Sequence, residues 1–214
     1  ADGSSWSAVT SRLQAKGYHV TAVQNPLTSL ADDVAATERV IARQSGDVLL
    51  VGHSWEGAVI SQAGNAQNVK GLVYLSALVP DSNESVADLL ERLHAPMEGM
   101  AVDRDGLIWL DNADAYHQLM ANDLSHYQAR LLAAAQQPIA ARVFSEKVQH
   151  AAWRDKPSWY LLTENDHALK PDVQALIARQ TGARVLRLNS SHMSMISHPD
   201  AVATFIDNAA RRSQ

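Results

Sequence analysis

The most constraining feature of the chain is a continuously apolar run, 48–51, that passes into a helical pattern within a few residues. A strand of this kind is typical of a parallel sheet, because helices cover both of its faces. Similar β-rich runs recur along the chain and alternate with helical patterns. The predicted strands are 18–23, 47–51, 71–75, 158–162 and 183–188, and the predicted helices are 7–16, 29–43, 55–64, 171–181 and 199–211. This order predicts a doubly wound, mostly parallel α/β sheet.

The regular alternation stops between about Pro80 and Arg154. Within this block the patterns at 85–93, 114–124 and 125–136 are helical, so we expect a helical insertion rather than more sheet. The predicted organisation is an α/β core made of residues 1–80 and 151–214, with the insertion at 81–150. A chain of 214 residues has room for one such domain and would be cramped as two.

Composition narrows the possible chemistry. Hydrophobic residues make up 46% of the chain, which is enough for a sizeable core. The net charge is −5 and Lys and Arg form no cluster, so no nucleic-acid partner is expected. The chain has 0 Cys, which excludes disulfides, thiolate nucleophiles and Cys-ligated metals. No apolar run reaches the length of a membrane span and no signal peptide is visible, so we expect no membrane insertion and a cytoplasmic location.

Ser54 lies at the turn between the apolar strand and the helical pattern, in the sequence Gly52-His53-Ser54-Trp55-Glu56-Gly57. A serine on such a sharp turn is exposed and its backbone is strained. The start of the following helix also offers backbone N–H groups, that of Trp55 first, to a developing oxyanion. Gly-x-Ser occurs in ordinary turns as well, but the strand before it and the helix after it favour a nucleophile.

A serine nucleophile needs a general base, and the chain has nine histidines. His192 follows the last predicted strand by a short loop, which places it at the carboxyl edge of the sheet, where catalytic groups collect. His198 lies next to Pro199 and fits the start of the last helix better. The side chain of His53 is expected to point away from Ser54, which favours a packing role.

Asp166 is the acid best placed to orient such a base. It follows the predicted strand 158–162 and would lie at the same edge of the sheet as His192. Glu164 and Asp172 are less well placed, Asp172 because Pro171 predicts the start of a helix there.

Six segments spread over nearly the whole chain carry a resemblance to a known family. They are Asp2-Gly3-Ser4-Ser5-Trp6, Gly17-Tyr18-His19-Val20, Gly52-His53-Ser54-Trp55, Leu78-Val79-Pro80-Asp81, Pro157-Ser158-Trp159-Tyr160 and Ser191-His192-Met193. In these segments the chain resembles bacterial α/β-hydrolases of the esterase type, related to plant methylesterases and hydroxynitrile lyases. The order Ser54, Asp166, His192 is also the chain order of catalytic triads in the α/β-hydrolase fold.

The resemblance implies a serine hydrolase that cleaves a small carboxylic ester through an acyl-enzyme. Ser54 would be the nucleophile, His192 the base and Asp166 its orienting acid, with no metal and no cofactor. The insertion at 81–150 would be a lid over the site. Substrate-binding residues are expected among Met97, Met100, Trp109, Leu110 and Met193. The expected partner is a small-molecule ester, and the sequence does not indicate an oligomeric state.

Two alternatives stay open. Related lyases carry Lys directly after the catalytic His and related methylesterases carry Met, so Met193 favours an esterase over a hydroxynitrile lyase. A dehalogenase or an epoxide hydrolase would require Asp in place of Ser54. The second alternative is a catalytically impaired, ligand-binding member of the fold, because Glu56 stands where the family has Gly or another small residue.

The resemblance also implies a strand and a His-Gly turn immediately before Asp2. That strand would be central, between the predicted strands 18–23 and 47–51, and its turn would supply the second oxyanion donor. The sequence begins at Ala1. We therefore expect either residues upstream of Ala1 or another segment of the chain to fill this position, since unpaired strand edges in a protein interior are costly.

Overall fold

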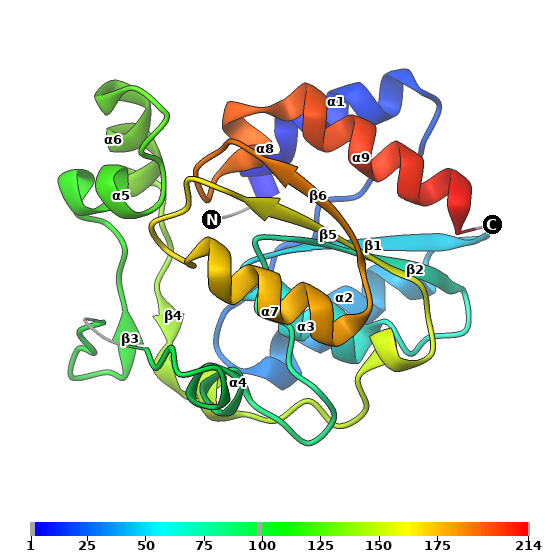
Figure 1. The fold of residues 1–214 in the computed structure, drawn as a ribbon, viewed down its shortest axis with the longest axis horizontal. Helices are drawn as coiled ribbons and strands as arrows, with labels where there is room; N and C mark the ends of the chain where they lie inside the picture. The colour runs from blue at the N-terminus through cyan, green and yellow to red at the C-terminus, as the bar shows by residue number, and fades with distance from the viewer. Residues whose placement is uncertain (1–2, 98–99, 214) are drawn as a thin grey trace.

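The computed structural model describes residues 3–97 and 100–213, so Asp2 of the first resembling segment and residues 98–99 of the insertion lie outside it. Its main sheet has four strands in the order β1-β2-β5-β6, and every neighbouring pair is parallel (Figure 1). The strands are β1 (Val48–His53), β2 (Val69–Leu75), β5 (Ser158–Thr163) and β6 (Arg184–Leu188). β5 is buried along its whole length, whereas most of β6 is exposed. These four strands confirm the predicted parallel α/β sheet.

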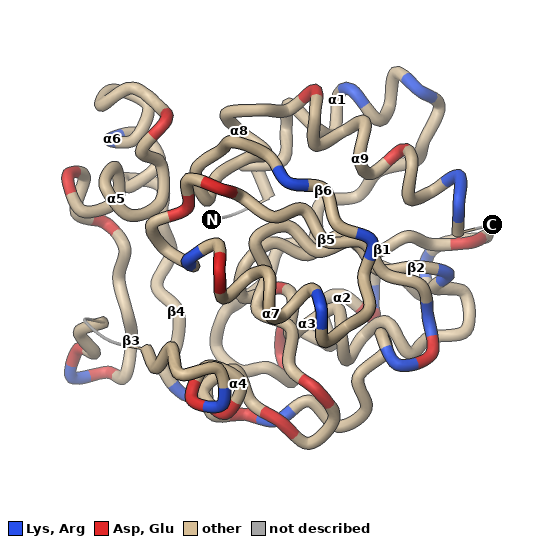
Figure 2. Tube along the Cα trace, viewed as in Figure 1, with Lys and Arg blue, Asp and Glu red and all other residues tan. Residues whose placement is uncertain are grey.

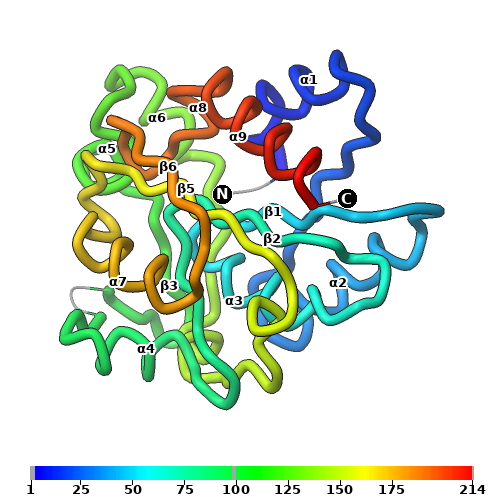
Figure 3. The backbone as a smooth tube through the Cα atoms, turned by 45° about the vertical axis from the view of Figure 1, so that its right-hand side comes forward, coloured from blue at the N-terminus to red at the C-terminus, as the bar shows by residue number. Residues whose placement is uncertain are grey.

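Helices cover both faces of this sheet, as expected of a doubly wound fold (Figures 1 and 3). On one face α1 packs against α9, and on the other α2 packs against α3 while α7 contacts β5. Their bounds are α1 (Ser7–Ala15), α2 (Leu30–Ala42), α3 (Glu56–Ala63), α7 (Pro171–Thr181), α8 (Ser194–Ser197) and α9 (Pro199–Arg212), with a 3₁₀ turn at Gly3–Trp6. β2 serves both layers because its side chains alternate: Leu72 and Tyr74 belong to one buried cluster, Val73 and Leu75 to the other.

Local sequence signals fix several helix ends. The side chains of Ser29, Ser85 and Ser125 each accept a backbone N–H at the start of a helix, which satisfies a donor that has no partner within the helix. Pro171 occupies the first turn of α7, where its missing N–H costs nothing. Gly182 ends the same helix with φ 66°, a left-handed conformation that glycine adopts without strain.

The insertion lies to one side of the sheet (Figure 1). It contains α4 (Val86–Arg92), β3 (Leu107–Ile108), α5 (Ala113–Leu119), α6 (His126–Ala134), β4 (Ile139–Ala140) and a 3₁₀ turn at Ala141–Ser145. A further 3₁₀ turn, Ala152–Arg154, follows it. β3 and β4 form a small antiparallel sheet. The expected helices are present, and the two short strands were not expected, because two residues are too few to give a periodic pattern.

The predicted strand at 18–23 is wrong: this segment has no regular secondary structure. A strand needs a neighbour for its backbone N–H and C=O groups, and among the described residues no strand pairs with the outer edge of β1. A cavity of about 520 Å³ lies instead between β1 and this segment. Its walls include Val20, Val51 and Ile60. Neither the expected central strand nor a substitute for it occurs in the part of the chain that the structure describes.

Charged residues of both signs are spread along the trace (Figure 2). Lys and Arg are interspersed with Asp and Glu on the core and on the insertion alike, which agrees with the absence of a basic cluster in the sequence. Within residues 3–97 and 100–213, none of the helices is both long and apolar enough for a membrane span.

The turn after β1 packs directly on the segment that follows β2. The carbonyl of Ser54 accepts the N–H of Leu78 at 3.0 Å. A Cβ atom built on Gly57 would lie 2.4 Å from the Leu78 carbonyl oxygen, and one on Gly52 would lie 2.8 Å from the Glu56 carbonyl oxygen. Gly52 and Gly57 are thus two positions of this turn at which a side chain would collide with backbone atoms.

Replacing Gly57 by Ala is expected to destabilise the protein, because its Cβ would collide with backbone atoms that cannot rotate away. Overpacking of this kind typically costs about 1–3 kcal/mol of unfolding free energy. Gly46→Ala is the matched control, since a Cβ at Gly46 has no atom within 4 Å. Urea denaturation of both variants measures the difference. Equal stabilities would contradict the close approach of the turn to Leu78.

Candidate active site

Three of the predicted residues follow three strands of the parallel sheet. Ser54 comes directly after β1, Asp166 shortly after β5 and His192 shortly after β6. The carboxyl ends of parallel strands meet at one edge of a sheet, so these loops share the edge at which α/β proteins bind ligands. Ser54 has φ 54°, a left-handed conformation that is uncommon for residues other than glycine. This is the strained strand-to-helix turn that the sequence predicts.

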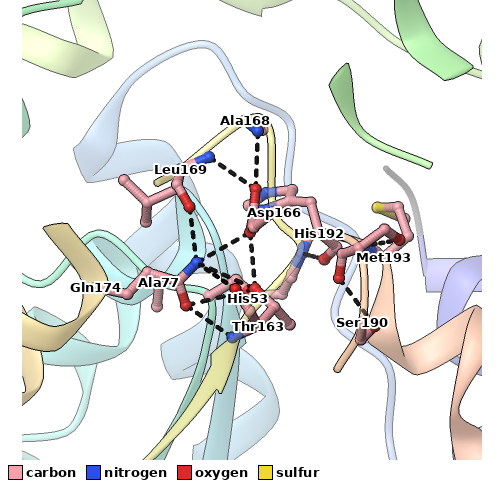
Figure 4. Close-up of polar contacts among 12 residues, drawn as sticks. His53, Ala77, Thr163, Asp166, Ala168, Leu169, Gln174, Ser190, His192 and Met193 are labelled. Atoms are coloured by element: carbon pink, nitrogen blue, oxygen red, sulfur yellow. Dashed lines mark hydrogen bonds and ion pairs between the residues drawn. The ribbon is translucent and has the colours of Figure 1, made fainter. Parts of the chain in front are cut away.

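Asp166 and His192 form a buried pair (Figure 4). The Nδ1 atom of His192 lies 2.7 Å from Oδ2 of Asp166, and the two residues are only 1% and 3% exposed. Burial alone would raise the pKa of Asp166, but its interaction with His192 and the hydrogen bonds it accepts outweigh burial and lower that pKa. An ionised Asp166 fixes the tautomer of neutral His192, because Nδ1 must then carry the proton.

The loop around Asp166 satisfies the other oxygen of the carboxylate. Oδ1 accepts the backbone N–H groups of Ala168 and Leu169, both at 2.8 Å, just before α7 begins (Figure 4). These bonds close a turn of the kind that an Asp side chain often makes with the backbone that follows it. The carboxylate is therefore held by its own loop as well as by His192.

The structure brings Asp166 and His192 together, and it places Ser54 at the same edge of the sheet without a hydrogen bond to them. Within the described residues, neither the Ser54 hydroxyl nor Nε2 of His192 has a hydrogen-bond partner. The backbone of Ser54 is held firmly, because its N–H donates to the carbonyl of Leu75 at 3.2 Å. The contact between nucleophile and base is often loose in hydrolases without substrate and tightens in the reacting complex.

Trp55 directly precedes α3 and is anchored by its side chain. Its indole Nε1–H donates to Oδ2 of Asp33 at 2.8 Å, and its ring lies edge-on to Phe144. Asp33 also accepts the N–H of Leu27, and burial raises the pKa of this carboxyl group. The sequence does not single out Asp33, because an acidic residue in the first turn of a helix is common there and stabilises the helix dipole. The backbone N–H of Trp55 has no protein acceptor among the described residues.

His53 has a more specific role than general packing. It is buried, its Nε2 lies 2.8 Å from the backbone carbonyl of His192, and the two rings are 4.5 Å apart. Burial lowers the pKa of His53 well below its usual range, so the ring is neutral and Nε2–H donates to that carbonyl. His53 thus supports the loop that carries His192, which its position beside Ser54 in the sequence does not reveal.

The insertion contacts the loops that carry Asp166 and His192. Oδ2 of Asp123 accepts the N–H of Ser191 at 2.9 Å, which fixes the residue before His192. The side-chain amide of Asn122 donates to the carbonyl of Asn165 at 3.2 Å, next to Asp166. The segment between α5 and α6 therefore connects the loop of Asp166 with the loop of His192.

The five predicted substrate-binding residues lie in different surroundings. Met97 and Met100 pack against one buried cluster, whereas Leu110 and Met193 belong to the other, and Met193 is fully buried. Trp109 is 46% exposed, because its indole N–H donates to Oδ2 of Asp103 at 3.0 Å on the surface of the insertion. Among the described residues, no group of three or more His, Asp or Glu side chains is arranged to hold a metal ion.

Comparison with known proteins defines the class. The model of the alpha/beta hydrolase family matches residues 1–205, and the chain belongs to that family. It is 31% identical to the alpha/beta hydrolase nvfD of Aspergillus novofumigatus, an alignment that covers 96% of this chain and 90% of the relative. It is 24% identical to a probable hydrolase, R7, of Phoma sp., over 96% of this chain and 92% of that one.

Solved structures share the fold. A pyrethroid hydrolase from Sphingobium faniae superposes with a TM-score of 0.85 at 20% identity, covering 98% of this chain and 93% of the other. Polyneuridine aldehyde esterase gives a TM-score of 0.82 at 19% identity, with 97% and 94% coverage. Tomato methylketone synthase I gives 0.81 at 18% identity, with 100% and 95% coverage. The described part of the chain therefore has the fold of these structures.

Glu56 stands two residues after Ser54, in the first turn of α3. Its side chain is half-buried and lines the cavity beside β1. Burial raises the pKa of Glu56 to about 7, and its charge interacts with those of Asp33 and His192. A carboxylate with this pKa is partly protonated at neutral pH, unlike a solvated glutamate.

Glu56 is expected to make stability depend on pH. Its pKa is about 7 in the folded protein and 4.5 in its unperturbed state, so the folded state binds the proton more tightly. Stability therefore falls as pH rises between these values, by at most about 1.4 kcal/mol per pH unit. Urea unfolding from pH 5 to 8 should show a smaller fall for Glu56→Gln than for the parent protein. The control Glu38→Gln, on the exposed side of α2, should keep the parent slope. If the unfolding free energy of Glu56→Gln fell with pH as steeply as that of the parent protein, the burial of this carboxyl group would be contradicted.

Proposed function

We propose that this chain is a serine hydrolase that cleaves a small carboxylic ester, with Ser54 as nucleophile, His192 as base and Asp166 as the acid that orients the base. The observation that carries the proposal is the buried Asp166–His192 pair at the same edge of the sheet as the left-handed turn of Ser54. Membership in the alpha/beta hydrolase family supports the same roles, since the order of the three residues along the chain is that of the fold's triads.

The reaction begins when Oγ of Ser54 attacks the carbonyl carbon of the ester. The hydroxyl proton passes to Nε2 of His192, and the π electrons of the carbonyl move onto its oxygen. When this tetrahedral intermediate collapses, the bond to the alcohol oxygen breaks and His192 returns the proton to the departing alcohol. A water molecule then repeats the sequence on the acyl-enzyme, which releases the carboxylic acid and regenerates Ser54.

Two features of the site favour this chemistry. Asp166 holds the Nδ1–H of His192 and so leaves Nε2 as the proton acceptor. The backbone N–H of Trp55, which has no acceptor among the described residues, donates to the oxyanion. One such donor typically contributes about 2.7–4 kcal/mol to transition-state stabilisation.

The insertion at 81–150 acts as the lid of this site in our proposal. Its contacts with Ser191 and Asn165 place it beside both catalytic loops. Met97, Met100 and Leu110 are the lid residues that we assign to binding the acyl or alcohol group, with Met193 from the histidine loop. Trp109 joins these residues only when its hydrogen bond to Asp103 is broken. Esterases and hydrolases among the solved structures of this fold agree with an ester substrate.

Ser54→Ala should abolish hydrolysis of a short p-nitrophenyl ester and modification by a fluorophosphonate probe. In enzymes with a catalytic triad, loss of one triad residue lowers kcat by up to about 10⁶-fold. Ser45→Ala, at an exposed position after α2, is the matched control and should keep both properties. Intact circular dichroism spectra of both variants exclude unfolding as the cause. Unchanged turnover in Ser54→Ala, or no labelling of the parent protein, would favour a ligand-binding member of the fold.

Glu56→Gly should raise kcat/KM for the same ester. The ionised carboxylate favours the protonated form of His192, which is inactive as a base, and the side chain adds bulk in the turn that carries Ser54. A displacement of about 1 Å at a reacting centre can cost ~10²-fold in rate. Glu56→Gln separates the two effects, because it removes the charge and keeps the bulk. Equal kcat/KM and an identical acid limb in all three proteins would show that Glu56 has no influence on catalysis.

A further inference from the structure

Gln174 is a fully buried residue of α7 whose amide makes hydrogen bonds on both sides. Its Oε1 accepts the N–H of Thr163 at 3.0 Å, and its Nε2 donates to the carbonyl of Leu169 at 2.7 Å. These two bonds lock the rotation of the amide. The same Nε2 lies 3.1 Å from Oδ2 of Asp166, the oxygen that faces His192 (Figure 4).

Thr163, the last residue of β5, reaches the same oxygen. Its hydroxyl donates to Oδ2 of Asp166 at 2.8 Å. Since that hydrogen is committed to the carboxylate, the hydroxyl of Ser76, 2.7 Å away, must donate to the Thr163 oxygen. Ser76, Thr163 and Asp166 are all buried, so these hydrogen bonds form away from solvent.

Three donors thus lie within hydrogen-bond distance of one carboxylate oxygen, namely Nδ1–H of His192, the Thr163 hydroxyl and the Gln174 amide. The second Nε2–H of Gln174 is shared between this oxygen and the Thr163 hydroxyl oxygen, which is 3.0 Å from Nε2. Donors to a carboxylate withdraw part of its negative charge, which weakens its attraction for a positive imidazolium beside it. They also fix the orientation of the carboxylate relative to the ring.

We propose that Gln174 and Thr163 are positioning residues that set the proton affinity of His192 through Oδ2 of Asp166. This inference rests on the proposed function for its catalytic meaning. By sharing the oxygen with His192, the two side chains keep the base unprotonated at lower pH than Asp166 alone would allow. They widen the pH range over which hydrolysis proceeds.

Other ionisable groups also face the pair. His53 contacts His192 from the end of β1, Glu56 acts on it from the start of α3, and Tyr160 of β5 lies near Asp166. None of these is altered by a substitution at Gln174 or Thr163. A difference between the parent protein and such a variant therefore reports on the donors to Oδ2.

The test measures the pH midpoint of the His192 imidazole titration by NMR on protein labelled with ¹⁵N-histidine. The signal is assigned by its loss in His192→Gln. Gln174→Leu and Thr163→Val each remove one donor and should move the midpoint up by about 0.5–1 pH unit. The acid limb of kcat/KM for a p-nitrophenyl ester should move in the same direction and by a similar amount.

Two matched controls separate tuning from packing. Thr163→Ser keeps the hydroxyl and should keep the parent midpoint. Ile177→Val trims a buried side chain on the same helix as Gln174 without touching the carboxylate, and it should lower only the melting temperature. If Gln174→Leu fails to fold, comparison of Thr163→Val with Thr163→Ser still shows whether a donor to Oδ2 shifts the midpoint of the His192 titration.

Unmoved midpoints in both Gln174→Leu and Thr163→Val, with stability alone reduced, would overturn the inference and leave the proposed function standing. Midpoints that rise as expected in a protein without esterase activity would uphold the tuning of His192 and refute the proposed function.

Discussion

The buried hydrogen bond between Asp166 and His192 is the interaction on which the candidate site depends. A carboxylate removed from water is costly unless donors replace its hydration. Here two backbone N–H groups serve one oxygen, and three side-chain donors serve the other. This explains why Asp166 can stay ionised although it is 3% exposed, and why the residues around it are specified so closely.

The second constraint is the direction of the strands in the sheet. All four strands of the main sheet run parallel, so the loops after β1, β5 and β6 meet at a single edge although they are far apart in sequence. The insertion then ties two of these loops together through Asn122 and Asp123. Neither the sheet nor the insertion performs chemistry, but together they reduce the freedom of the groups that would perform it.

Much of this arrangement follows from local sequence patterns. The apolar strands and the caps of the helices are short-range signals, and the positions of Ser54, Asp166 and His192 just after strands place them at one edge of a parallel sheet. The segment 18–23 has a strand pattern but no strand structure, because pairing depends on a neighbour that no local pattern describes. The short strands β3 and β4 were missed since two residues carry no periodicity.

The supporting residues were beyond sequence reasoning for a different reason. Gln174, Asp33 and His53 act through contacts with residues that are distant in sequence or lie on another element. A polar residue in a helix usually points to solvent, so its type and spacing do not reveal a buried partner. The place of Trp109 is likewise set by a bond that its residue type does not reveal, since its indole N–H donates to Asp103 at the surface of the insertion.

The most direct test of the central claim is to detect, by NMR, the proton between Asp166 and His192. A buried Nδ1–H that donates to a carboxylate gives a far-downfield proton resonance that exchanges slowly with water. We predict one such resonance in the parent protein at neutral pH and its loss in Asp166→Ala with the fold retained. Absence of the resonance from the parent, or its persistence in Asp166→Ala, would contradict the pairing of the acid with the base.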